Sequence, residues 1–197
     1  MSEPEIHWNE SLERLVKKEA ERALALRWAH DESQRWCASW NTYLFFPSTF
    51  LSILSGAGSV GANSLLPFDG AATFVGCVSL LVGCLQTIQN YFAFAKRSES
   101  HRIASLQYGK IHAELSLQLS LPKKERKKAN DLIEYLKDET DRLSEIAPQI
   151  PAAIKVKFHE KFADIKSAVP TILNGLEEVE ITTDTISTPK PILRITL

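Results

Sequence analysis

Two long apolar stretches stand out from an otherwise mixed pattern of polar and hydrophobic positions. They cover residues 47–66 and 71–95, and between Arg35 and Lys96 the only charged side chain is that of Asp69. Crossing the hydrocarbon core of a bilayer takes about 20 helical residues, so each stretch is long enough to span it. The intervening Pro-Phe-Asp-Gly sequence predicts a tight turn. Together these features predict a two-helix transmembrane hairpin.

The residues at the ends of the two stretches predict how the hairpin lies in the membrane. Aromatic side chains precede the first stretch and end the second, at Trp36, Trp40, Tyr43, Phe45, Phe46, Tyr91, Phe92 and Phe94. Basic side chains flank the same ends, at Lys17, Lys18, Arg22, Arg27, Arg35, Lys96, Arg97 and Arg102. Aromatic belts mark the membrane interface, and basic flanks mark its cytosolic side. We therefore expect a multi-pass integral membrane protein with two spans and with both the N and C termini in the cytosol. The acidic start, Met1 to Glu5, does not resemble a cleavable signal.

A soluble helical hairpin buried in a large core is the alternative, and the mean hydropathy of −0.12 is compatible with it. However, no other part of the chain is apolar enough to surround two helices that are apolar on all sides. Such helices need lipid or further copies of themselves. We therefore expect the lipid bilayer to be a partner of this chain.

The remaining sequence predicts further helices, so the expected fold class is all-α. Within residues 1–35, apolar positions recur at helical spacing among many charges, at Trp8, Leu12, Leu15, Ala23, Leu26 and Ala29. This amphipathic helix either lies on the membrane surface or packs against the cytosolic helices. The hairpin region follows at 36–95, with Pro47 in the first turn of its first helix. A cytosolic helical region is expected at 96–174, and an extended or disordered tail at 175–197.

The glycines of the first apolar stretch spell G-x-G-x-x-G at Gly56, Gly58 and Gly61, which is the pattern of a dinucleotide-binding turn. That turn needs a helix that begins at the glycines and an acidic residue about 20 residues later. Pro67 would end such a helix after about two turns, and the only acid before Glu99 comes too early. We therefore predict that these glycines, with Gly76 and Gly83 of the second stretch, allow close helix packing in the membrane.

Catalytic and metal-binding patterns are sparse. The five histidines are scattered, and His101 reads as a surface or packing residue. Neither G-x-S-x-G nor a Walker lysine occurs, and the three cysteines do not imply a disulfide framework. We expect no enzyme activity, no cofactor and no metal. The basic run 123–128 predicts the solvated first turn of a helix, with contact to anionic lipid or nucleic acid as the alternative, and a nucleic-acid partner is not expected.

Polar residues inside the spans are more informative. Four serines step by four, three and four residues along one face of the first helix, at Ser48, Ser52, Ser55 and Ser59, and Asn63 lies near the same stripe. Such a stripe can join helices through hydroxyl hydrogen bonds. It can also line a water-filled pore, which requires several copies around an axis. The spacing leaves both interpretations open.

The overall layout resembles that of the SLATT proteins, which are two-transmembrane effectors associated with nucleotide-second-messenger immunity systems. The helix that leaves the membrane, Phe94 to His112, carries the resemblance best, and the likeness covers roughly residues 10–165. The resemblance implies an oligomeric effector that forms a pore or perturbs a membrane. Because no sensor, nuclease or nucleotide-generating domain is fused to this sequence, the trigger is expected to come from a separate sensor protein.

Two function classes follow. The first is a homo-oligomeric membrane pore or ion channel, which the serine stripe and the resemblance favour. The second is a non-conducting membrane scaffold whose cytosolic helices recruit a partner protein, which the length of the cytosolic region favours.

Overall fold

The computed structural model describes residues 6–65, 70–163 and 170–174. The helices in these segments are α1 (Glu10–Leu65), α2 (Ala71–Phe92), α3 (Phe94–Ser120), α4 (Ala129–Ile146), α5 (Ala152–Phe162) and α6 (Thr171–Asn174). No strand occurs in the described part of the chain, so the predicted all-α fold is confirmed there. Two helical stretches, Glu10–Val60 and Ala71–Ser120, are long and apolar enough to cross a membrane.

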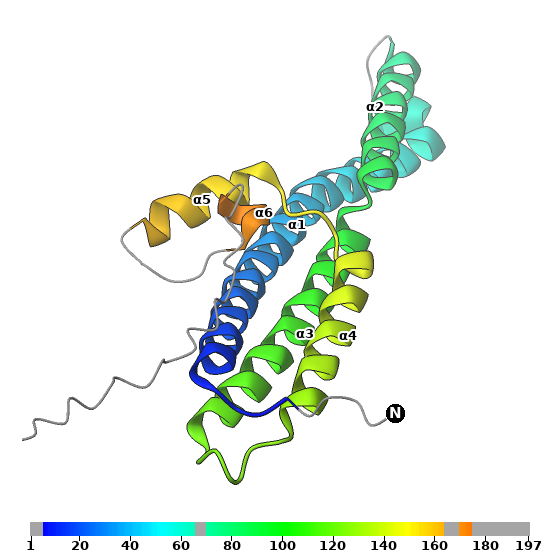
Figure 1. Ribbon diagram of the computed structural model, residues 1–197. Helices are drawn as coiled ribbons and strands as arrows, with labels where there is room; N and C mark the ends of the chain where they lie inside the picture. The colour runs from blue at the N-terminus through cyan, green and yellow to red at the C-terminus, as the bar shows by residue number, and fades with distance from the viewer. Residues whose placement is uncertain (1–5, 66–69, 164–169, 175–197) are drawn as a thin grey trace, which may run out of the picture.

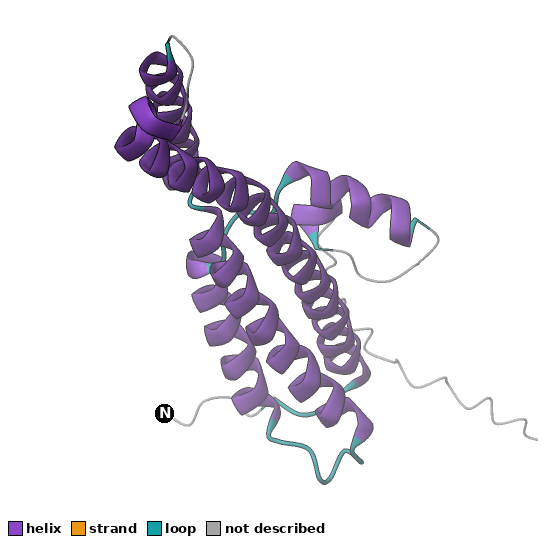
Figure 2. Ribbon diagram, turned by 180° about the vertical axis from the view of Figure 1, so that it is seen from behind, coloured by secondary structure: helices purple, strands orange, loops and turns teal. Residues whose placement is uncertain are grey.

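The long helix α1 organises the molecule (Figures 1 and 2). Its N-terminal part lies alongside α3, and its C-terminal part pairs with α2 in a hairpin that projects from one end of the molecule. Helix α4 packs beside α3, while α5 and α6 lie against another side of α1. All of α4, α5 and α6 therefore gather at the same end of the hairpin.

The expectation that a membrane helix begins at Pro47 is wrong, because α1 continues through that residue without a break. Proline lacks a backbone N–H, so one hydrogen bond to the carbonyl four residues earlier is lost there, while the neighbouring residues remain helical. Proline inside a helix commonly causes a bend, and α1 changes direction as it passes from α3 to α2 (Figure 2). The predicted boundary at residue 35 likewise falls within a continuous helix.

The helix of the second apolar stretch is interrupted before the predicted end of that stretch at residue 95. Helix α2 stops at Phe92 rather than at residue 95, and α3 begins at Phe94. Between them, Ala93 adopts a left-handed conformation, with φ 46° and ψ 44°, while its N–H donates to the Gln89 carbonyl at 2.9 Å. A side chain makes this conformation costly for residues other than glycine. One residue thus changes the helix direction without a loop.

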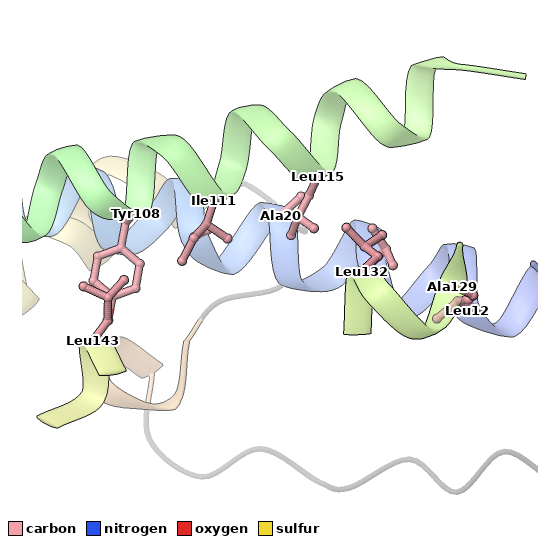
Figure 3. Close-up of a cluster of buried hydrophobic side chains, with 10 residues drawn as sticks. Leu12, Ala20, Tyr108, Ile111, Leu115, Ala129, Leu132 and Leu143 are labelled. Atoms are coloured by element: carbon pink, nitrogen blue, oxygen red, sulfur yellow. The ribbon is translucent and has the colours of Figure 1, made fainter. Parts of the chain in front are cut away.

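The main core lies where α1, α3 and α4 meet (Figure 3). Its buried members are Leu12, Val16, Ala20, Ala23, Tyr108, Ile111, Leu115, Ala129, Leu132 and Leu143. Several come from the amphipathic pattern of the first 35 residues. The alternative in which this segment packs against other helices is therefore the one observed. A second cluster joins α1 to α5 and α6 through Ala29, Ile150, Ile154, Phe158 and Leu173.

The basic run 123–128 is not the first turn of a helix, since it precedes α4 in the loop after α3. Three of its cations are ion-paired with the helices beside it. Arg126 Nη1 lies 2.5 Å and Lys123 Nζ 3.2 Å from Glu13, and Lys127 Nζ lies 2.6 Å from Glu114. Hydrogen bonds from Arg126 and Lys123 hold the pKa of Glu13 below its usual value. These residues fasten the loop to α1 and α3.

Candidate functional site: the hairpin and its exit

The hairpin contact between α1 and α2 is built from small residues. A Cβ atom placed on Gly58 would lie 3.0 Å from Cγ2 of Val75, closer than ordinary contact. The absence of a side chain at Gly58 therefore lets the two helices approach. Gly58 thus lies at the contact between α1 and α2.

The other predicted packing glycines lie elsewhere. A Cβ atom at Gly56, Gly76 or Gly83 would have no neighbouring atom within 4 Å. Within one chain these three glycines do not pack against a helix. Gly61 and Asn63 belong to the last turn of α1, and their side-chain surroundings lie outside the described part of the structure.

The serine stripe divides into two pairs. Ser48 is buried against α2, where its hydroxyl donates to the Phe45 carbonyl at 3.0 Å and accepts from Nε2 of Gln89 at 3.3 Å. Ser55 forms a hydrogen bond with Ser79 of α2. These two serines therefore join the helices.

Ser52 and Ser59 form the second pair, and both are exposed. The Ser59 hydroxyl donates to the Gly56 carbonyl of its own helix at 3.0 Å. Ser52 and Ser59 lie three residues before and four residues after Ser55, so both sit on the side of α1 next to the Ser55–Ser79 bond. They form a polar strip beside the hairpin contact.

Helix α2 continues this polar strip with Ser79 and Gln86, which the sequence analysis did not select, and with Asn90 and the predicted packing glycine Gly83. Gly83, Gln86 and Asn90 follow Ser79 after four, seven and eleven residues, which places all four on one exposed stripe. The spacing of Ser79, Gln86 and Asn90 is visible in the sequence. The pairing of Ser79 with Ser55 is not, because it depends on the register between the helices.

The opposite flank of the hairpin is apolar. Phe74, Leu81 and Ile88 recur every seven residues on α2, and Leu54 precedes Ser55 on α1 by one residue. All four side chains are exposed. The hairpin is therefore two-sided, with hydroxyl, amide and glycine positions on one flank and large apolar side chains on the other.

Aromatic residues surround the junction at which the hairpin meets the rest of the protein. The Phe94 ring stacks on those of Trp40 and Phe92, with centroid distances of 6.2 and 5.4 Å, and Trp36 meets it edge-on at 6.1 Å. Further rings point outward, at Tyr43, Phe45, Phe46 and Tyr91. The rings of Trp36, Trp40, Tyr91, Phe92 and Phe94 thus form one connected group at the base of the hairpin.

A buried histidine pair lies just beyond this junction. The Nδ1 atoms of His30 on α1 and His101 on α3 are 2.9 Å apart, so one ring donates and the other accepts. The His30 ring also stacks on Tyr108, with centroids 5.5 Å apart. Nε2 of His101 is buried and makes no hydrogen bond to any residue that the structure describes. His101 is therefore a packing residue rather than a surface one.

Burial disfavours the charged form of both imidazoles. It lowers the pKa of His30 to about 4, assisted by the neighbouring His101. Burial also lowers the pKa of His101 to about 4, assisted by the positive charge of Arg97. The pair is neutral near pH 7. The described residues contain no group of three histidine, cysteine or acidic side chains that could hold a metal ion.

Comparison of the chain with known protein families, with curated proteins and with solved structures finds no significant match, so the interpretation of this site rests on its own chemistry.

Proposed function

We propose that the protein is an integral membrane protein in which the hairpin of α1 and α2 spans the bilayer twice. Helix α2 has 22 residues and would be about 33 Å long, close to the roughly 30 Å of a hydrocarbon core. In the most apolar windows of the two candidate spans, only 6% and 11% of residues are buried inside the chain. The core helices of a soluble protein would be mostly buried, so lipid or further copies must cover these surfaces.

The position of the remaining helices supports an orientation with both termini on the cytosolic side. The aromatic group and the basic residues Arg35, Lys96 and Arg97 lie at the base of the hairpin, toward α3. Aromatic belts are typical of a membrane interface, and basic flanks are typical of its cytosolic side. Helices α3 to α6 would then all lie in the cytosol.

Within the membrane, we propose that several copies assemble around an axis and form a pore. The two-sided hairpin is the observation that carries this proposal. The side-chain amides of Gln86 and Asn90 have no hydrogen-bond partner among the described residues, and facing lipid would leave them unsatisfied. A ring of copies would turn this flank toward a water-filled axis and the apolar flank toward lipid.

In this arrangement Ser52, Ser59 and Gln86 line the pore, whereas Ser48 and Ser55 hold each hairpin together. Neutral hydroxyls and amides offset part of the dehydration cost of an ion without binding it tightly. Such a pore would conduct with little selectivity. The resemblance to SLATT proteins implies the same kind of oligomeric effector, with the opening signal supplied by a separate sensor protein.

The test is to measure current through bilayers that contain the purified protein. Replacing Ser52 and Ser59 together by Leu should remove most of the current while the oligomer persists, because an apolar constriction favours dewetting. Ala57→Leu is the matched control, since Ala57 is exposed on the same helix, two residues from Ser55 and thus on a different side. Unchanged current in the Ser52→Leu, Ser59→Leu variant would contradict the pore assignment.

A non-conducting scaffold is the second candidate, and helix α4 favours it. Five exposed acids recur on one face of α4 at heptad spacing, at Asp131, Glu134, Asp138, Asp141 and Glu145. A continuous acidic face outside the membrane suits a basic protein partner. If the wild-type protein passes no current under any voltage or added nucleotide messenger, the scaffold becomes the better account.

A further inference from the structure

Helix α3 carries a second, largely apolar row on the side opposite its buried face. The row consists of Ile103, Leu106, Lys110, Ala113 and Leu117, spaced by three and four residues in turn. This is the spacing at which a helix offers a continuous seam to a partner. Ile103, Leu106 and Leu117 are 43%, 54% and 53% exposed, whereas Leu115 on the other face is fully buried. In the proposed topology α3 lies outside the bilayer, so lipid does not cover this row.

A shallow hollow of about 500 Å³ opens beside the row. It lies between Arg27 of α1 and the α3 residues Ile103, Leu106, Lys110 and Ala113. The Arg27 side chain rests on Gly109, where an added Cβ atom would lie 3.3 Å from its Cδ atom. Because Gly109 has no side chain, the Arg27 side chain can lie directly against α3 at this position.

Two cations border this apolar hollow. Neither Arg27 nor Lys110 forms an ion pair within the described part of the chain, whereas the nearby Arg35, Arg102 and Arg142 all do. The surface therefore combines apolar contact area with two available positive charges. Its complement is a segment in which apolar and acidic side chains alternate.

The chain itself contains such a segment beyond α6. Residues 176–186 read Leu-Glu-Glu-Val-Glu-Ile-Thr-Thr-Asp-Thr-Ile, with four acids and no basic residue. They lie outside the described residues, but α6 just before them is anchored by Leu173 in the cluster that contains Ala29. Ala29 is two residues from Arg27, which is about 3 Å along the α1 axis. Ala29 and Arg27 lie about 200° apart around α1, and half the circumference of a helix roughly 10–12 Å across is about 16–19 Å, so about five or six extended residues would be enough to reach the hollow.

We propose that the acidic segment 176–186 binds to the outward row of α3 in the same chain. Its apolar side chains occupy the hollow, and its carboxylates lie beside Arg27 and Lys110. The contact does not depend on whether the hairpin conducts ions. It depends only on α3 lying outside the membrane.

Disulfide cross-linking in the full-length protein tests this contact. Cys77 and Cys84 are replaced by alanine, while the fully buried Cys37 is kept. Ala113→Cys combined with Thr183→Cys should cross-link within one chain under mild oxidation. Ser144→Cys combined with Thr183→Cys is the control, because Ser144 is exposed on α4. Equal cross-linking in the control, or cross-links only between two chains, would overturn the proposal.

Charge reversal then separates specific docking from chance collision. Arg27→Glu with Lys110→Glu should lower the cross-linking yield about tenfold, since like charges across a contact are repulsive. Adding Glu180→Lys and Asp184→Lys should restore it. The reactivity of Ala113→Cys toward a thiol reagent provides a second readout and should rise when the charges are reversed on one side only. A yield and a reactivity that ignore both reversals would overturn the proposal.

Discussion

The long helix α1 packs against helices in two regions, and the two contacts are formed by different types of side chain. Against α3 and α4 it buries large apolar side chains such as Val16 and meets Leu115 and Leu132. Against α2 it offers the small residues Ser48, Ser55 and Gly58. In water, burial of apolar area drives packing. In a membrane that drive is absent between helices, so close approach and hydroxyl hydrogen bonds replace it. In the proposed topology, one helix therefore packs by both sets of rules along its length.

The exposed surfaces of the two regions differ in the same way. The hairpin exposes large apolar side chains on its outer flank, including Phe74, Leu81 and Ile88. Around the first core, by contrast, the surface carries ion pairs such as those of Glu13 and Glu114. The change occurs at the aromatic junction, which is where a membrane interface is expected.

The largest expected effect on stability concerns the core between α1, α3 and α4. Leu115→Ala removes a fully buried side chain from the contact of α3 with α1. It should lower the free energy of unfolding by about 3 kcal/mol, as large-to-small core substitutions do. Leu24→Ala, at an exposed position of α1, should change it by less than about 0.5 kcal/mol. Denaturant unfolding in detergent gives both values, and similar losses would mean that the cluster is not a core.

The histidine pair should make this same contact sensitive to acid. The pKa values of His30 and His101 are lowered from 6.5 to about 4 in the folded protein. Between these two values the unfolded chain binds more protons, so the free energy of unfolding falls as the pH drops from 6.5 toward 4. A shift of this size is worth roughly 3 kcal/mol. Above pH 6.5 this contribution to stability is complete.

Replacing both histidines by asparagine tests that pH dependence, because amides do not titrate and can hydrogen-bond to each other. Between pH 7 and pH 4.5 the variant should lose clearly less free energy of unfolding than the wild-type protein. His159→Asn is the control, since His159 is exposed on α5 and should leave the pH dependence intact. An unchanged pH dependence in the double variant would assign the acid sensitivity to other groups.

Glycine substitutions should separate contacts within the hairpin from contacts between chains. Gly58→Leu collides with Val75 and should destabilise the hairpin by about 1–3 kcal/mol, the usual cost of overpacking. Gly56→Leu meets no atom of its own chain and should leave the hairpin intact. Disulfide formation between Ser55→Cys and Ser79→Cys reports on the hairpin contact, and particle mass in detergent reports on assembly. Equal loss of cross-linking in both variants would contradict the assignment of Gly58.

The hairpin itself could be predicted because its signals are local. The gaps between charges set the length of each apolar stretch, whereas the predicted turn at Pro-Phe-Asp-Gly lies outside the described residues apart from Gly70. Helix boundaries were harder to predict. Proline is common in the first turn of a helix and also occurs inside kinked ones, so Pro47 did not reveal that α1 is continuous. The sequence does not indicate that Ala93 is left-handed, since alanine rarely adopts that conformation.

Features of the site that depend on register could not be predicted from one sequence. The serine spacing predicted one face of α1. It did not separate Ser48 and Ser55, which meet α2, from Ser52 and Ser59, which do not. His30 and His101 are 71 residues apart and face each other only because α1 and α3 lie side by side. Such pairs follow from tertiary packing, which local periodicity does not encode.

The smallest predicted effect concerns the single residue that separates the two regions on the α2–α3 side. Ala93 holds a left-handed conformation that glycine adopts without steric cost. Ala93→Gly should therefore raise the free energy of unfolding by about 0.5–1 kcal/mol, the relief of strain being partly offset by the greater freedom of glycine in the unfolded chain. Ala95→Gly, two residues later within α3, should instead lower it by about 0.5–1 kcal/mol, because glycine weakens a regular helix. Thermal unfolding of both variants in the same detergent gives the two signs. If both substitutions destabilise the protein, Ala93 is helical in solution, and α2 and α3 then form one unbroken helix across the membrane interface.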